Sequence, residues 1–248
     1  MKNLIIFLIL MILFNGCSHT SPYRQIKPNE IIQNKYVLVE ASDRLFEINK
    51  KYDTVPKLKT GLPRFHKSIK GSQYTINIQT YPYKYMQMKD SYLNKDAKYL
   101  DSDTYVETYD ENDKEQNIKY RRHWIAYINN MKCSGQVFSR NHGGTLYSAT
   151  TKNYSIACGY YDKTEKEYNG QRLLMISYIY NYANDKSRLQ KDTNLKREEL
   201  LTKQQAEDGL KQAVKELVKT IKIKNFDKER MEKEGLMHYD KEFKSSKW

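Results

Sequence analysis

Period-two alternation of apolar and polar residues limits the fold of this chain more than any other feature. Between Tyr74 and Thr80 the apolar residues occupy every second position, and the pattern recurs in Asn153–Tyr161. Successive side chains of a β-strand point to opposite faces, so both segments are expected to be strands with one buried face. Arg172–Ala183 is almost wholly apolar, as expected of a central strand. The chain therefore favours a sheet.

Further strands are expected where β-branched and aromatic residues gather between turn residues. These predicted strands are Lys35–Ala41, Tyr83–Met88, Thr104–Tyr109, Ile118–Ile128, Gly135–Arg140 and Thr145–Thr150. Asn129-Asn130 is expected to end one strand and Asn141–Gly144 to form a hairpin loop, because Asn and Gly tolerate positive φ. Tyr52–Gly71 is rich in Pro and Gly, which predicts a loop and places His66 in it.

The chain changes character after Asn184, where aromatic residues become rare and Lys, Glu, Gln, Leu and Ala dominate. Thr202 and Gln205 have the spacing of a capping box, which begins a helix. The apolar residues of the expected helical stripe are Ala206, Leu210, Ala213, Val214, Leu217, Val218 and Ile221. We expect this helix to pack on the sheet. Insertion into a membrane surface is the alternative, although the stripe contains no Trp or Phe.

Together these patterns predict an α+β fold: an antiparallel β-meander sheet of roughly five to eight strands with a long C-terminal helix packed on one face. The predicted organisation is a signal peptide at 1–16, a tether at 17–30, a single α+β domain at 31–225 and a charged C-terminal tail at 226–248.

The N-terminal apolar run, Leu4–Phe14, has eleven residues and is preceded by Lys2. A helix needs about 20 apolar residues to span a bilayer, so this run is too short to span. It fits a secretory signal in which Gly16 is the small residue before cleavage. A buried core helix is the alternative, but such a helix would show polar residues at helical spacing and the run has none.

The segment Leu13–Cys17 resembles the lipobox of bacterial lipoproteins, and the resemblance covers only the first seventeen residues. It implies that Cys17 becomes the first residue of the mature chain, with a diacylglycerol on its sulfur and an acyl chain such as palmitate on its amino group. More than one acyl chain gives stable anchoring. The expected location is the cell membrane or outer membrane, lipid-anchored and facing the periplasm or the surface. Ordinary secretion is the alternative.

With Cys17 assigned to lipid, Cys133 and Cys158 remain as an even pair. In an oxidising compartment this predicts a disulfide. Closure of a loop of about 25 residues would stabilise the fold by roughly 3–4 kcal/mol in the chain-entropy treatment. Two separately buried cysteines are the alternative.

Metal sites receive little support from the spacing of candidate ligands. A zinc site made of Cys133, Cys158, His123 and His142 would lack a closely spaced ligand pair. Asp110–Asn117 is expected to be an acidic turn, since it lacks the glycine of a calcium-binding loop. We therefore predict no metal and no cofactor.

The chain has a formal net charge of +13. Lysines are spread along its length, usually with Asp or Glu nearby, which is typical of solvated faces. A basic surface for anionic lipids or acidic glycans is the alternative. The export signal argues against nucleic acid as a partner.

No sequence pattern identifies a catalytic site: Gly-x-Ser-x-Gly, Walker A and His-Glu-x-x-His are all absent. Arg122, His123 and Trp124, with His142, could line a groove for an anionic or sugar ligand, or simply alternate between core and solvent. We expect a lipid-anchored, non-catalytic envelope lipoprotein that binds or scaffolds an envelope protein or glycan. One alternative is an envelope hydrolase acting on peptidoglycan or a lipid-linked substrate, with His123 or His142 as base. The other is a surface adhesin that binds ligands on its Tyr-rich sheet.

Overall fold

The computed structural model describes residues 23–41, 47–49, 61–70, 72–82, 118–143, 148–183 and 194–239. Several predictions lie outside these residues. They are the signal peptide, Cys17, the strands Tyr83–Met88 and Thr104–Tyr109, and the acidic turn Asp110–Asn117.

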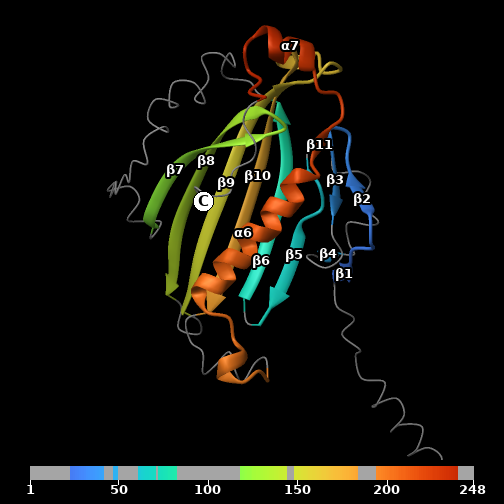
Figure 1. The fold of residues 1–248 in the computed structure, drawn as a ribbon. Coiled ribbons are helices and arrows are strands. Elements are labelled where there is room, and N and C mark those ends of the chain that lie inside the picture. The colour runs from blue at the N-terminus through green and yellow to red at the C-terminus, as the bar shows by residue number, and fades with distance from the viewer. Residues whose placement is uncertain are drawn as a thin grey trace, which may run out of the picture.

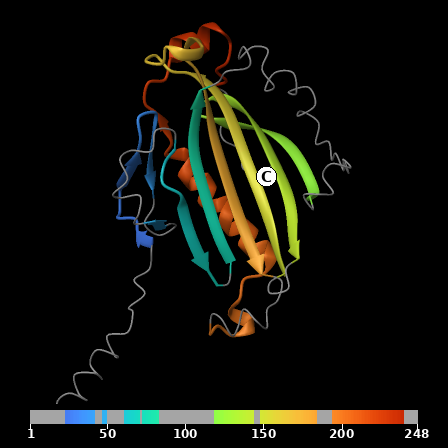
Figure 2. The same ribbon diagram turned by 180° about the vertical axis from the view of Figure 1, so that it is seen from behind.

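A large antiparallel sheet forms most of the described structure (Figures 1 and 2). In spatial order its strands are β1 (Tyr23–Gln25), β4 (Glu47–Asn49), β5 (Phe65–Ile69), β6 (Ser72–Pro82), β10 (Gln171–Ala183), β9 (Ser148–Tyr161), β8 (Met131–Gly143) and β7 (Ile118–Ile128). The predicted antiparallel sheet is therefore confirmed, and β10 is central as expected from its apolar run.

The order of the strands departs from a simple meander at β6. From β7 to β10 each strand pairs with the next one in the chain. β6, however, pairs with β10, so that Ile78 lies opposite Ile176. Local alternation cannot specify such a pairing, because it joins segments that are far apart in the sequence.

A second sheet has three strands in the order β11 (Lys222–Ile223), β3 (Val37–Ala41) and β2 (Glu30–Gln33). The described helices are two short 3-10 turns, η2 (Glu167–Gly170) and η3 (Arg197–Glu199), and the α-helices α6 (Lys203–Lys219) and α7 (Lys228–Lys233). α6 crosses obliquely over β6 and β10 and contacts both strands as well as β3 (Figure 1). Among the described residues, no helix is long and apolar enough to cross a membrane.

The buried core includes residues of the large sheet, the small sheet, α6 and α7. On β6 the alternation predicted for Tyr74, Ile76 and Ile78 is confirmed, because these side chains are buried and those between them are half-buried. The buried core residues of β9 and β10 are Tyr154, Ile156, Cys158, Tyr160, Leu174, Ile176, Tyr178, Tyr180 and Tyr182. On α6 the buried apolar residues are Ala206, Leu210, Ala213, Val214, Leu217 and Val218. Burial of this apolar surface is the main force that holds the elements together.

The predicted turn at Asn129-Asn130 and the predicted capping box at Thr202 are both confirmed. β7 ends at Ile128, and Asn129 and Asn130 have φ of 50° and 62°, as a two-residue hairpin turn requires. At the start of α6 the capping box is present: the Thr202 hydroxyl accepts from the Gln205 backbone N–H, and the Gln205 side chain accepts from the Thr202 N–H.

The loop predicted for Tyr52–Gly71 is wrong in its last part, where β5 forms. Phe65 is fully buried and pairs with Ile76 of β6, and this burial outweighs the Pro and Gly signals nearby. His66 is consequently a strand residue, and its ring stacks on Tyr23 with 4.7 Å between centroids.

Candidate functional site

Three of the four predicted ligand-binding residues lie side by side on β7. Arg122, His123 and Trp124 face Val137, Gln136 and Gly135 of β8 in the strand register. His142 lies on β8, six positions beyond Gln136, and strands rise about 3.3 Å per residue. His142 is therefore about 20 Å along the sheet from the rung of His123, so the two histidines do not share one site.

His142 was expected in a hairpin loop, and this expectation is wrong. β8 continues to Gly143, which pairs with Ser148 of β9, and His142 pairs with Ala149. Asn and Gly permit positive φ but do not require it. A continued ladder with β9 keeps these residues extended.

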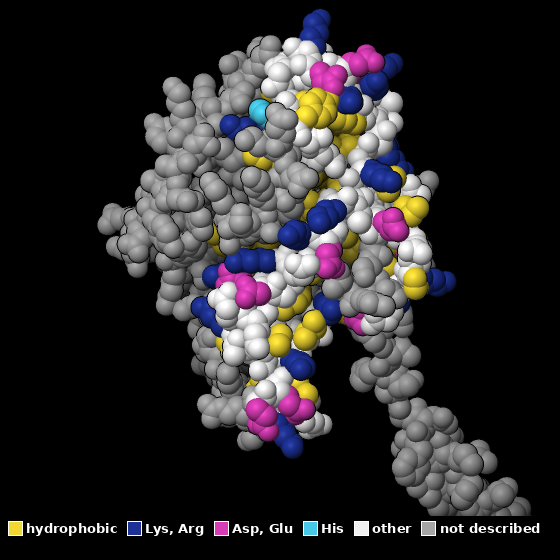
Figure 3. Space-filling model, in the orientation of Figure 1, with side chains coloured by type: hydrophobic (Ala, Val, Ile, Leu, Met, Phe, Trp, Pro, Cys, Tyr) yellow, Lys and Arg dark blue, Asp and Glu magenta, His cyan; other side chains and the backbone are white. Residues whose placement is uncertain are grey.

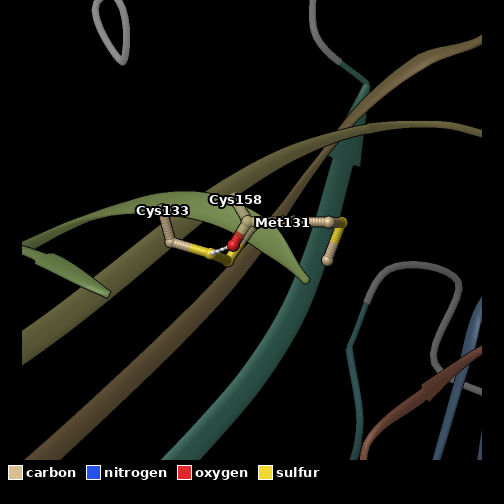
Figure 4. The surroundings of a disulfide bond; sticks show 3 residues. All are labelled: Met131, Cys133 and Cys158. Atoms are coloured by element: carbon tan, nitrogen blue, oxygen red, sulfur yellow. Dashed lines mark hydrogen bonds between the residues drawn. A yellow bond between two sulfur atoms is a disulfide. The ribbon is translucent and has the colours of Figure 1, made fainter. Parts of the chain in front are cut away.

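Cys133 and Cys158 form a disulfide between β8 and β9, with 2.11 Å between their sulfur atoms (Figure 4). Both are buried, and in the strand register Ala126 of β7 and Leu174 of β10 flank the bridge. The Cys133 sulfur also lies 3.4 Å from the Met131 carbonyl oxygen, a contact without a donated hydrogen because the sulfur is oxidised. An oxidised pair offers no thiolate, so it serves neither as nucleophile nor as zinc ligand in this state.

A buried arginine lies where β6, β9 and β10 meet at one end of the sheet. Arg172 is 1% exposed and donates to Glu165 Oε2 over 2.9 Å. Its second terminal nitrogen lies 3.4 Å from both the carbonyl and hydroxyl oxygens of Thr80. The guanidinium carbon is 3.5 Å from the centroid of the Tyr36 ring, a cation–π contact. These contacts hold the Arg172 charge inside the protein.

Burial and the charge of Arg172 shift the pKa values of the ionisable groups around it. Burial alone would raise the pKa of Glu165, but hydrogen bonds from backbone N–H groups and the charge of Arg172 lower it below its ordinary value. Burial raises the pKa of Tyr160, the cross-strand neighbour of Arg172, far above its ordinary value. Glu165 therefore stays ionised near neutral pH and Tyr160 stays a neutral phenol, a state suited to packing rather than to proton transfer.

A second buried charge, Glu207, joins α6 to β9 and β10. Its carboxylate accepts from Lys152 Nζ at 2.6 Å, from Lys211 Nζ at 3.1 Å and from Tyr180 Oη at 3.3 Å. The Tyr154 hydroxyl donates to the same carboxylate. We call these five side chains the Glu207 network.

The electrostatics of the Glu207 network keep the carboxylate ionised. Burial alone would raise the pKa of Glu207, but hydrogen bonds from Lys152 and Tyr154 and the charges of Lys152 and Lys211 outweigh it, so the pKa falls to about 2. A carboxylate with this pKa does not donate a proton at neutral pH. The network therefore acts as a fixed ionic link between helix and sheet.

An exposed aromatic side chain stands on the turn between β9 and β10. Tyr168, Asn169 and Gly170 have φ of 49°, 58° and 76°, a left-handed run that is strained for the first two residues. Arg230 of α7 donates to the Asn169 carbonyl over 2.8 Å and lies over the Tyr161 ring at 3.8 Å. These contacts hold the turn, and Tyr168 remains 37% exposed.

Sequence reasoning missed both buried charges, although each has a signal. Arg172 lies two and four positions before Leu174 and Ile176, so the three residues share one face of β10. Glu207 lies three residues before Leu210 in the helical stripe. A charged residue at a core position of a strong pattern indicates a buried, paired group.

Charges on the face that carries α6 are mixed in sign. Figure 3 shows Lys and Arg side chains interspersed with Asp and Glu over this face. Within the described residues, no group of three or more His, Cys, Asp or Glu side chains is arranged to hold a metal ion. Comparison of the chain with family models, with curated proteins and with solved structures gave no match.

Proposed function

We propose that the chain is a lipid-anchored lipoprotein of the bacterial envelope whose sheet domain binds or scaffolds another envelope component without catalysis. The observation that carries the proposal is the buried Cys133–Cys158 disulfide. Disulfides of this kind form and persist in oxidising compartments. The bridge thus agrees with the secretory signal expected in the first sixteen residues.

The position of the first strand supports a role close to a membrane. β1 begins at Tyr23, six residues after the proposed lipidated Cys17. Six residues reach at most about 20 Å when fully extended. A lipid on Cys17 would therefore keep this side of the sheet near the bilayer.

The two buried charged side chains are paired within the fold, and this supports a binding role over a catalytic one. Glu207 and Arg172 are both held by ionic and hydrogen-bond partners within the fold. We also propose that α6 packs along one face of the sheet, fastened there by the Glu207 network, so that partners bind elsewhere on the sheet.

Mass spectrometry of the intact native protein tests the anchor. The expected mass is that of a chain that begins at Cys17 and carries a diacylglycerol and an acyl chain. A Cys17→Ser variant should leave the membrane fraction, whereas the matched Ser18→Ala variant should stay. A chain that keeps Met1, or an unmodified Cys17, would overturn the proposal.

Activity measurements test the non-catalytic part. The purified chain should not turn over muropeptides. Turnover that disappears in His123→Ala or His142→Ala would instead identify an envelope hydrolase.

A ligand-binding or adhesin role is the second candidate, and the exposed Tyr168 on its strained turn favours it. Aromatic side chains held in fixed positions stack on sugar rings. Glycan binding that is lost in Tyr168→Ala and kept in Lys166→Ala would support this candidate.

A further inference from the structure

The small sheet has one buried face and one outer face. Ile32 of β2 pairs with Val39 of β3, and both side chains are buried. Because successive side chains of a strand point to opposite faces, the residues next to this pair along each strand face outward. In the strand register Leu38 lies between Gln33 and Lys222. The residues of the outer face are Ile31, Gln33, Leu38, Glu40 and Lys222.

An aliphatic side chain is exposed to solvent on this outer face. Ile31 is 56% exposed, and Leu38 on the neighbouring strand is half-buried. The other large apolar side chains that are exposed among the described residues are Tyr168 and Tyr239, and each of these has a hydroxyl group. A single exposed apolar residue is common on protein surfaces, so its surroundings decide what it can bind.

Cationic side chains dominate the outer face and the segments next to it. The four exposed lysines are Lys27, Lys35, Lys222 and Lys224. The first precedes β2, the second lies in the turn between β2 and β3, and the other two begin and follow β11. In the ranges 27–40 and 222–224 the exposed acidic residue is Glu40, whereas Glu30 is paired with Arg24 over 2.7 Å. We call the four lysines, with Ile31 and Leu38, the lysine surface.

The position of the lysine surface suits contact with a membrane. The small sheet lies on the same side of the molecule as β1 (Figures 1 and 2). Lys27 follows the proposed lipidated Cys17 by ten residues, which reach at most about 35 Å when fully extended. A lipid on Cys17 would therefore hold the lysine surface within reach of the headgroups.

Two kinds of anion could bind these lysines. An acidic glycan would pair with the lysines but would leave Ile31 in solvent. An anionic bilayer offers phosphate groups to the lysines and an apolar layer to Ile31, and each cation close to such a surface adds to the binding. The combination of positive charge with an exposed aliphatic side chain therefore favours the bilayer.

We propose that the lysine surface binds an anionic lipid bilayer, with Ile31 inserted below the headgroups and the four lysines against their phosphates. This inference rests on the proposed lipid anchor and adds to it a second contact with the same membrane. Two contacts fix the orientation in which the large sheet is presented to a partner, whereas a lipid on a tether alone leaves it free to rotate.

Binding of an unlipidated chain to vesicles tests the proposal. The chain from residue 17 onward contains every described residue, and Cys17→Ser leaves it without a lipid. The probes are vesicles of phosphatidylcholine and vesicles of phosphatidylcholine with an equal part of phosphatidylglycerol. We expect binding at least about tenfold tighter to the anionic vesicles, and weaker binding as salt is added.

Lysine variants locate the surface. Each cation near an anionic bilayer contributes about fivefold in affinity, so Lys27→Gln combined with Lys224→Gln should weaken binding at least about tenfold. The matched control is Lys196→Gln combined with Lys203→Gln, which changes the net charge equally at exposed positions near the start of α6. This control should weaken binding by less than about twofold.

A fluorescent reporter tests the insertion of Ile31. In the Cys17→Ser chain both remaining cysteines are in the disulfide, so an environment-sensitive dye reacts only with an added cysteine. The dye should shift its emission to the blue on anionic vesicles when it is attached at Ile31→Cys. It should not shift at Gln212→Cys, on the exposed side of α6.

Four results would overturn the proposal. They are equal or absent binding to the two kinds of vesicle, equal losses in the two double variants, a dye shift at position 212 without one at position 31, and lysine-dependent binding to a soluble acidic polysaccharide without binding to vesicles. These outcomes are separate from the test of the anchor. An unmodified Cys17 in the native protein would leave vesicle binding by the Ser variant intact, and failed vesicle binding would leave the mass of the native protein unchanged.

Discussion

Glu207→Gln removes one charge from the ionic link between α6 and the sheet while keeping the shape of the side chain. The pKa of Glu207 falls from 4.5 to about 2 in the folded protein. Each unit of pKa shift corresponds to about 1.4 kcal/mol, so ionised Glu207 stabilises the fold by about 3 kcal/mol. The Tyr154 hydroxyl donates to Oε1 and the Tyr180 hydroxyl to Oε2, so the amide keeps an oxygen acceptor for only one of them. The expected loss at pH 7 is therefore about 2–3 kcal/mol.

The loss should depend on pH in a direction set by the lowered pKa. Stabilisation by a carboxylate with a lowered pKa is complete above the unfolded pKa of 4.5 and disappears as the pH falls through about 2. The wild-type protein should thus lose stability between about pH 5 and pH 2, and the Gln variant should lack this part of the slope. Near pH 2 the two proteins should differ by less than about 1 kcal/mol.

Urea unfolding followed by circular dichroism at pH 7 and pH 2.5 measures both quantities. Glu216→Gln is the matched control, because Glu216 lies on the exposed side of the same helix and should change stability by less than about 0.5 kcal/mol. Equal losses for Glu207→Gln at the two pH values would refute the electrostatic explanation and point to packing instead.

Three further substitutions test other parts of the fold. Replacing Cys133 and Cys158 by Ala should lower the free energy of unfolding in urea by about 3–4 kcal/mol, since the bridge spans 25 positions; unchanged stability would contradict the disulfide. Arg172→Lys should cost at least about 2 kcal/mol, because an ammonium cannot both pair with the partly buried Glu165 carboxylate and stack on the Tyr36 ring; a loss below about 0.5 kcal/mol in thermal unfolding would contradict this. Gly209→Ala should destabilise the protein because the new Cβ would lie 2.7 Å from Tyr74 Oη, and it should stabilise a Tyr74→Phe background by up to about 1 kcal/mol; equal effects in both backgrounds would rule out the clash.

The elements that could be predicted from the sequence are those in which local signals agree. Ile118–Ile128 has β-favouring residues throughout and ends at Asn129-Asn130, so its bounds match β7. The almost wholly apolar run of β10 predicts a central strand, and β10 lies between β6 and β9 in the large sheet. In both cases burial, propensity and turn chemistry indicate the same structure.

What could not be predicted depends on contacts between distant segments. β5 forms because Phe65 reaches the core through its pairing with Ile76, against the local Pro and Gly signals. The pairing of β6 with β10 and the small sheet of β2, β3 and β11 have no local signature. The Glu207 network likewise joins five side chains from three elements, and apart from the i,i+4 spacing of Glu207 and Lys211 no spacing in the sequence identifies them as partners.

The pairing of β6 with β10 also sets an order in which the protein can fold. Ile78 pairs with Ile176, which follows 98 positions later, so the centre of the sheet can form only after Ile176 has been synthesised. A nascent chain emerges from its N-terminus, so β6 is present long before its partner has been made. During that interval the apolar residues of β6 face solvent, and sheet closure over so long a separation is slow. This exposed apolar surface favours aggregation of the nascent chain until synthesis has passed the last residue of β10.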